Sequence, residues 1–121
     1  MKENRDSPAS ASAASPRPAL TMDAAGLIVE WTPDAEAIFG WPRAEAIGRL
    51  LSAVIIPERH RAAHEAGLRR FLESGRGGLL DRTIEIVAVD RDGREFDAEV
   101  RIAAERSADG YRFPATVRRL P

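Results

Sequence analysis

Two histidines, His60 and His64, are the residues of this chain whose type and spacing best suit chemistry. They lie four positions apart, so on a helix both imidazoles would project from one face, where they could bind a metal ion or transfer protons. Arg61 stands where the helix of a zinc protease requires a glutamate, and no third ligand follows at a suitable spacing. A zinc site shared by the pair is therefore only a secondary interpretation.

The other groups that could act in catalysis are few. The carboxylates Asp97 and Glu99 alternate with apolar residues on a strand-like run, which predicts an outer sheet face with ion pairs or partner contacts instead of acid–base chemistry. The chain has no cysteine, which excludes a cysteine nucleophile, a disulfide framework and an iron–sulfur site. We therefore predict no catalytic residues and no enzymatic activity.

Composition limits the classes of partner and location. A net charge of −1 gives no broad attraction to nucleic acid or to a membrane surface. The longest apolar runs, residues 50–57 and 84–89, are too short to span a bilayer, and the N-terminal residues lack the apolar core of a secretory signal. We therefore predict a cytoplasmic protein without direct contact to nucleic acid or membrane.

The first 18 residues differ from the rest in composition. Residues 1–18 are rich in alanine, serine and proline, and they cannot bury enough apolar surface to offset the entropy lost on ordering. A disordered tail is therefore predicted at residues 1–18. The remaining residues 19–120 are predicted to form one domain of ordinary globular composition.

The first half of that domain begins with strand signals and continues with a capped helix. Residues 20–23 and 27–31 are predicted strands, and Gly26 favours a turn between them. Thr32 is a preferred helix N-cap residue, and Gly40 is a natural stop seven residues after the first helical position. The sequence therefore predicts a β-turn-β unit followed by a short helix.

The middle of the chain is predicted to be helical. A second short helix is expected at residues 42–47, an apolar segment packed under the sheet at residues 50–56, and a long helix at residues 57–73. A flexible glycine-rich loop is expected at residues 75–78. One apolar or weakly polar stripe on the long helix is formed by His60, His64, Leu68, Phe71 and Leu72.

The second half of the domain has the patterns of strands. Residues 80–89 and 94–104 are predicted to form a hairpin around Asp92 and Gly93, and residues 111–120 form the last strand. Pro114 within that strand indicates a bulge or a local break in pairing. Strands separated by a helical block predict an α+β domain with helices on one face of an antiparallel sheet.

Five short motifs occur in an order that resembles the PAS family. They are D-x-x-G-x-I-x-x-W (residues 23–31), A-E-x-I-F-G-W (35–41), E-A-I-G-R (45–49), R-D-G-R-E-F (91–96) and F-x-A-x-V-R (113–118). The resemblance covers nearly all of the predicted domain. It implies the PAS fold, a five-stranded antiparallel sheet with helices packed on one face and a small-molecule cavity between them.

The resemblance also implies a sensory role in bacterial signal transduction or transcription regulation. PAS modules serve histidine kinases, cyclases and transcription regulators, and they often form homodimers. The first prediction is a module that senses a small ligand and relays the signal by protein–protein contact to such an effector in trans, since no output segment follows residue 120 in this sequence. The alternative is a ligand-free interaction or dimerisation module.

A third interpretation, a haem-based gas or redox sensor, comes from residues 57–71, which resemble the helix that carries the proximal ligand in haem-PAS sensors. The resemblance implies His64 as the haem-iron ligand and Arg70 as a contact to a haem propionate. Ile84 stands where those sensors have an oxygen-binding arginine, with Arg82 two residues earlier. We expect apolar cavity residues from helix, loop and sheet: Ile55, Leu68, Phe71, Leu79, Ile84, Ile86, Val100 and Ile102.

Overall fold

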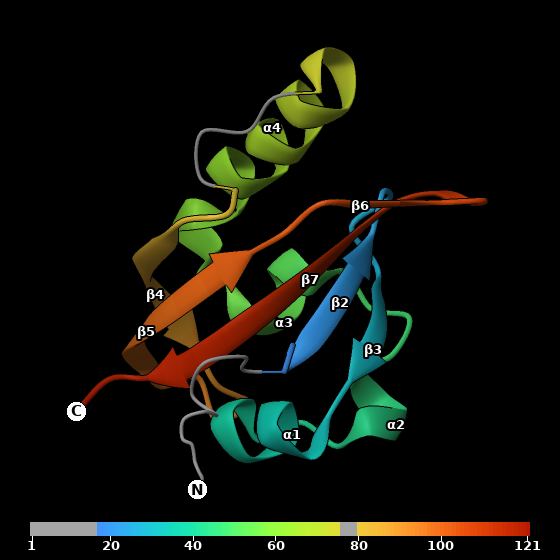
Figure 1. The fold of residues 1–121 in the computed structure, drawn as a ribbon. Helices are drawn as coiled ribbons and strands as arrows, with labels where there is room; N and C mark the ends of the chain where they lie inside the picture. Colours follow the sequence, from blue (N-terminus) through green and yellow to red (C-terminus); the bar gives the residue numbers. More distant parts are fainter. Residues whose placement is uncertain (1–16, 76–79) are drawn as a thin grey trace, which may run out of the picture.

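The structure is a computed structural model that describes residues 17–75 and 80–121 (Figure 1). The predicted tail at residues 1–18 and the predicted loop at residues 75–78 therefore lie mostly outside the described residues. The strands are β2 (Leu20–Asp23), β3 (Ile28–Trp31), β4 (Thr83–Val89), β5 (Glu95–Ile102), β6 (Glu105–Ser107) and β7 (Gly110–Arg119). The helices are α1 (Pro33–Phe39), α2 (Arg43–Ala46), α3 (Leu51–Ile55) and α4 (Glu58–Ser74).

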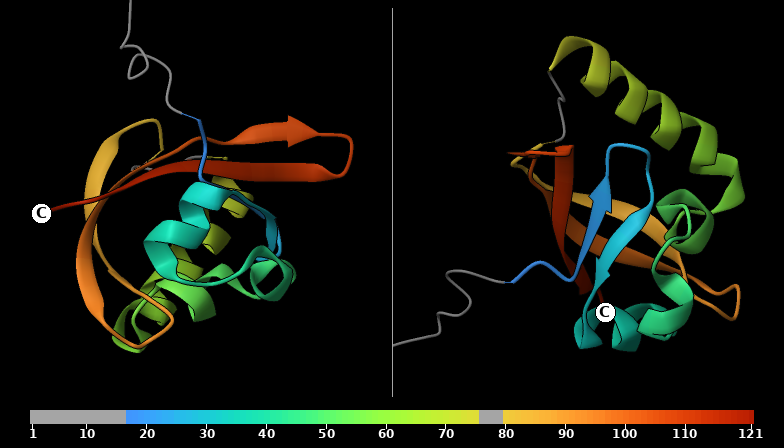
Figure 2. Two further views of the ribbon diagram at one scale, coloured as in Figure 1. Left: turned by 90° about the horizontal axis from the view of Figure 1, so that it is seen from below. Right: turned by 90° about the vertical axis from the view of Figure 1, so that its right-hand side faces the viewer.

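The strands form one antiparallel sheet in the order β3-β2-β7-β5-β4, and β6 adds to β7. The first and last of the described strands, β2 and β7, therefore pair in the middle of the sheet. Figure 2 shows the helices gathered on one side of this sheet. The predicted α+β fold, an antiparallel sheet with helices on one face, is confirmed.

The turn between β2 and β3 is built by one aspartate and one glycine. Oδ1 of Asp23 accepts hydrogen bonds from the backbone N–H of Ala25 at 2.9 Å and of Leu27 at 3.0 Å. Gly26 has a φ of 87°, in the left-handed region that favours glycine. The carbonyl of Gly26 also accepts from the N–H of Leu51 at 2.8 Å. The predicted turn is therefore joined directly to the start of α3.

The cap of α1 also has the predicted form. The hydroxyl of Thr32 accepts from the N–H of Ala35 at 3.3 Å and donates to the carbonyl of Ala19 at 2.8 Å. Gly40 ends the helix with a φ of 79°. A single threonine side chain thus satisfies a free N–H of the helix and ties that helix to the start of β2.

The core lies between the inner face of the sheet and the helices. Phe39 of α1 is fully buried and contacts the ring of Trp31 at a centroid distance of 5.6 Å and the ring of Phe96 at 5.8 Å. The indole N–H of Trp31 donates to the carbonyl of Trp41 at 2.9 Å. This aromatic cluster joins β3, α1 and β5 into one packed layer.

The sequence patterns do not predict strand β6. A break in pairing opposite Pro114 separates β6 from β5. The β5–β7 ladder ends at Ile102, and pairing with β7 resumes in the same register at Glu105. Pro114 of β7 lies in this gap, where it has no N–H to donate, although its carbonyl accepts from Ala103 at 3.0 Å. The predicted local break at Pro114 is confirmed on this side, while pairing with Thr21 of β2 continues on the other.

Two predicted boundaries change. Strand β4 begins at Thr83, not at residue 80, because Asp81 adopts a φ of 59° that an extended strand does not allow. The predicted helix at residues 42–47 is reduced to the four residues of α2. The apolar segment at residues 50–56 is mainly the helix α3, and four of its five residues are buried.

The predicted apolar stripe on α4 is only partly buried. Phe71 is the buried residue of this 17-residue helix, whereas His60 is exposed and Leu72 is 42% exposed. The last turns of α4 extend beyond the sheet (Figure 1). Among the described residues, no helix is both long and apolar enough to cross a membrane.

Replacing Thr32 tests whether this cap holds the first helix and the first strand together. Thr32→Val keeps the shape but removes both hydroxyl hydrogen bonds, so we expect the free energy of unfolding to fall by about 1–2 kcal/mol. Thr32→Ser retains the hydroxyl and should stay close to wild type. Urea denaturation of the three proteins gives the comparison, and equal stability of the valine variant would contradict this role.

Candidate functional site

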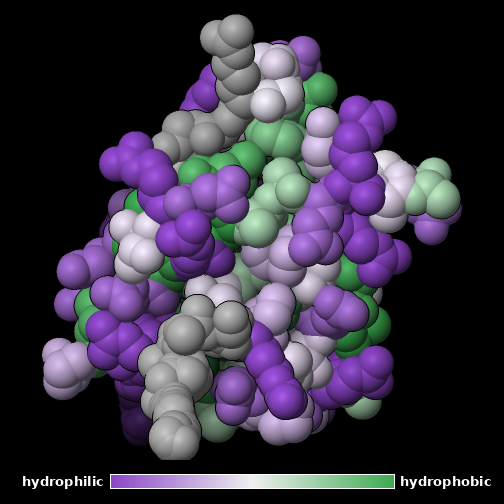
Figure 3. All heavy atoms as spheres, in the orientation of Figure 1, coloured by the Kyte–Doolittle hydropathy of each residue, from purple (hydrophilic) through white to green (hydrophobic). Residues whose placement is uncertain are grey.

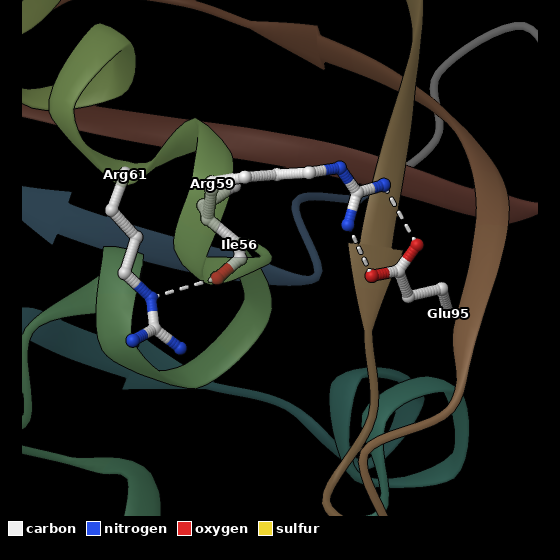
Figure 4. Close-up of polar contacts among 4 residues, drawn as sticks. All are labelled: Ile56, Arg59, Arg61 and Glu95. Carbon is white, nitrogen blue, oxygen red and sulfur yellow. Dashed lines mark hydrogen bonds and ion pairs between the residues drawn. The ribbon is translucent and has the colours of Figure 1, made fainter.

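Helix α4 is held to the sheet near its N-terminal end by an ion pair (Figure 4). The guanidinium of Arg59 binds Glu95, the first residue of β5, with Nη1 to Oε2 at 2.5 Å and Nη2 to Oε1 at 2.8 Å. The hydrogen bonds from Arg59 lower the pKa of Glu95, which therefore stays ionised. This two-point contact fixes the direction of the first turn of α4 relative to β5.

A second anchor connects the same end of α4 to α3. Nε of Arg61 donates to the carbonyl of Ile56 at 2.9 Å (Figure 4). It also donates to the carbonyl of Ser52 at 2.9 Å, and Nη2 donates to the carbonyl of Ala53 at 3.4 Å. These carbonyls belong to α3 and to the residue after it, where the helix leaves acceptors without partners of its own. The arginine that excluded a zinc-protease motif therefore has a structural role.

A cavity of about 260 Å³ lies between α4, the β2–β3 turn and the start of α3. Its apolar lining consists of Ala25, Gly26, Leu50, Leu68 and Leu72. Leu50 is 43% exposed and Leu72 is 42% exposed, and they are the two large apolar residues that stand out as exposed in the described part of the chain. The cavity thus has an apolar rim that is open to solvent.

The polar lining is formed by Ser52, His64, Glu65 and Arg69. The hydroxyl of Ser52 donates to Oε2 of Glu65 at 3.0 Å, so this carboxylate is held by α3. Arg69 forms no hydrogen bond or ion pair with any of the residues that the structure describes. One carboxylate and one guanidinium therefore line the same cavity without pairing with each other.

His64 is half-buried in this cavity. Its Nδ1 is buried and has no hydrogen-bond partner. Burial lowers the pKa of His64, and the nearby charge of Glu65 only partly opposes this effect. The imidazole is therefore neutral at neutral pH, with one nitrogen atom that no described residue satisfies.

The cavity brings together only part of the predicted site. His64 and Leu68 line it, and Arg70 lies exposed on the same helix outside the lining. The ring of Phe71 is buried against Tyr111 and Phe113, with centroid distances of 5.0 and 5.3 Å. Leu79 lies outside the described residues. The other predicted residues belong to α3 or to the inner face of the sheet and lie outside the lining: Ile55, Ile84, Ile86, Val100 and Ile102.

The sequence patterns do not predict the cavity wall opposite α4, nor the two charged residues of the lining. Gly26 was assigned only to a turn, and Glu65 and Arg69 only to a solvated helix face. One available signal was that Leu68 and Leu72 share a helix face with Glu65, since residues three and four positions apart are neighbours on a helix.

The cavity does not coincide with the expected haem site. Of the residues that the haem resemblance implies, His64 lines the cavity, whereas Arg70 lies outside the lining and the ring of Phe71 packs against Tyr111 and Phe113. A haem-binding role of His64 therefore stays a prediction. A zinc site shared by His60 and His64 is not supported, because His60 is exposed and no group of three metal-ligating side chains occurs among the described residues.

Comparison with known proteins was made on sequence and on structure. The family model of the PAS fold matches residues 10–118. An uncharacterized protein of Azorhizobium caulinodans is 37% identical over 99 residues, which are 82% of this chain and 14% of that protein. Sensor protein FixL of Bradyrhizobium diazoefficiens is 27% identical over 101 residues, which are 84% of this chain and 20% of FixL.

A solved structure with the same fold is the PAS domain of the quorum-sensing receptor RpfR of Cronobacter turicensis in complex with BDSF. The TM-score is 0.65 at 13% identity, over 88% of this chain and 96% of that domain. The chain spans one fifth or less of the length of the two curated relatives above. Because the family model covers most of the chain, the chain belongs to the PAS fold family and is a PAS sensory domain.

Proposed function

We propose that this PAS domain senses a small organic ligand in the cavity between α4, α3 and the β2–β3 turn. The observation that carries the proposal is the cavity itself, where an uncovered apolar rim meets a neutral His64 with an unpaired Nδ1. A concave apolar site with a few convergent polar groups is the usual form of a ligand site. Binding would cover the apolar rim in place of solvent.

The relatives support a sensory role without naming the ligand. The RpfR domain, which shares the fold alone, is a receptor domain that binds BDSF. FixL is a sensor protein in which a segment like this chain is one fifth of the whole. By this analogy the domain passes its signal to an effector protein, such as a kinase, a cyclase or a transcription regulator.

The route for the signal begins at the anchors of α4. A ligand that touches His64, Leu68 and the rim lies against the outer turns of α4, while Arg59 transmits any change of helix direction to Glu95 at the start of β5. Glu99, four residues further along β5, pairs with Arg118 of β7 at 3.1 Å. In this proposal, β5 carries the change from α4 to the rest of the sheet.

The alternative function is a ligand-free interaction module, and the helix-free face of the sheet favours it. Figure 3 shows this face with hydrophilic side chains interspersed among hydrophobic ones. A mixed surface of this kind suits a transient contact with an effector more than a permanent interface. Both functions use this face, and only the first uses the cavity.

Filling the cavity tests the first function. When a fragment library is screened by NMR, we expect some fragments to change the amide chemical shifts of Ala25, Gly26 and His64, because these residues line the cavity. Leu68→Trp should abolish those shifts by occupying the space. Ala63→Trp, exposed on the same helix, is the matched control and should retain them. Binding that survives Leu68→Trp would place the ligand elsewhere, and no binder at all would favour the interaction module.

The Arg59–Glu95 pair is expected to control the motion of α4 more than global stability. Because both side chains are exposed, Arg59→Gln should change the free energy of unfolding only slightly. The same substitution should nevertheless speed the hydrogen exchange of the α4 amides at residues 62–66. The charge swap Arg59→Glu with Glu95→Arg should restore slow exchange. Arg118→Gln, the control, should leave the exchange rates of the α4 amides unchanged. Unaltered exchange after Arg59→Gln would refute the coupling.

His64 is expected to make stability depend on pH. The unfolded chain takes up a proton near the ordinary histidine pKa of 6.5, whereas burial lowers the pKa in the folded state. Stability should therefore fall as the pH drops from about 7.5 through 6.5, until the lower folded-state pKa is passed. His64→Gln should remove this part of the decrease in urea unfolding. His60→Gln, at an exposed position, is the control, and identical pH profiles for wild type and His64→Gln would count against a buried neutral imidazole.

A further inference from the structure

The charges of the cavity do not pair where pairing would be favourable. Glu65 precedes Arg69 by four positions on α4, the order and spacing at which a glutamate and a basic residue attract each other on a helix. No ion pair joins them in the described residues, because Glu65 instead accepts from the hydroxyl of Ser52. Arg69 has no partner among the described residues. The cavity thus presents one negative and one positive group to an occupant.

Between and around these charges the wall is apolar. Leu68 lies on the same helical face between them, and the exposed side chains of Leu50 and Leu72 form the rim. His64 carries no charge at neutral pH, so the two charges of the lining balance. Glu65 and Arg69 are both exposed, so a ligand with one charge would pair with one of them and leave the other solvated, whereas a ligand that carries both charges can pair with both.

The size of the cavity limits the ligand. A water molecule occupies about 30 Å³ of liquid volume, so a cavity of about 260 Å³ has room for about nine non-hydrogen atoms. This is the size of a free aliphatic amino acid such as leucine.

We propose that the ligand of this cavity is a free zwitterionic amino acid with an apolar side chain. Its carboxylate binds Arg69, its ammonium group binds Glu65, and its side chain covers Leu50 and Leu72. The inference rests on the proposed function, because it assigns a ligand class to the same cavity.

The test compares leucine with analogues that lack one charge each. Amide NMR titrations of the whole chain at low ionic strength use L-leucine, L-leucinamide, which lacks the carboxylate, and 4-methylpentanoate, which lacks the ammonium group. We expect leucine to change the amide chemical shifts of Ala25 and Gly26, and these changes to saturate below about 10 mM leucine. Each analogue should bind at least about tenfold more weakly than leucine.

Variants then assign each charge. Arg69→Gln should weaken leucine about tenfold and leave leucinamide unaffected, and Glu65→Gln should weaken leucine similarly and leave 4-methylpentanoate unaffected. The glutamine at position 65 can still accept from Ser52, so the wall is preserved. Arg70→Gln and Glu73→Gln, exposed on the same helix outside the lining, are the controls and should bind leucine as wild type does.

Two failures can be told apart. If leucine and other apolar amino acids bind no better than the single-charge analogues, while the fragment screen still finds ligands that Leu68→Trp abolishes, the amino-acid proposal is overturned and the sensory cavity stands. If the cavity binds nothing in either experiment, the proposal and the function on which it rests both fail.

Discussion

The pairing of β2 with both β3 and β7 is the constraint on which the rest of the structure depends. It joins the first and last of the described strands, and the N–H of Ala19 extends it by donating to the carbonyl of Ala115 at 2.7 Å. Because β2 is paired on both sides, the β2–β3 turn that contains Gly26 is held in a fixed place at the end of these strands. The cavity can form only because that turn faces α4 across α3.

The manner in which α4 is attached determines how open the cavity is. Its polar anchors, Arg59 and Arg61, belong to its first turn, and its buried anchor is the single ring of Phe71 near the other end. Between them the helix faces the turn over side chains that do not fill the space. A helix held firmly at one end and by one aromatic contact near the other can change its angle at low energetic cost.

The sequence predicted those features whose physics is local. The cap at Thr32, the turn at Gly26 and the alternating strand that includes Val100 depend on residues close in sequence, and the structure has all three. The cavity depended instead on the angle of α4, which is set by Phe71 packing on Tyr111, 40 positions away. No periodicity encodes such a contact, so the prediction placed the site against the sheet, whereas the cavity lies against the turn.

The energetic imperfections of the domain are not spread evenly. Two side-chain nitrogens in the described residues are buried without a partner, and one of them, Nε1 of Trp41, belongs to a ring stacked by the guanidinium groups of Arg49 and Arg91. The other is Nδ1 of His64, which lies in the same cavity as the exposed leucines of the rim. Natural sequences depart from local consistency chiefly at functional sites. An unsatisfied buried nitrogen and an exposed apolar rim are departures of different chemical kinds, and the binding site proposed above would account for both, whereas defects of packing would have to arise in the same cavity independently.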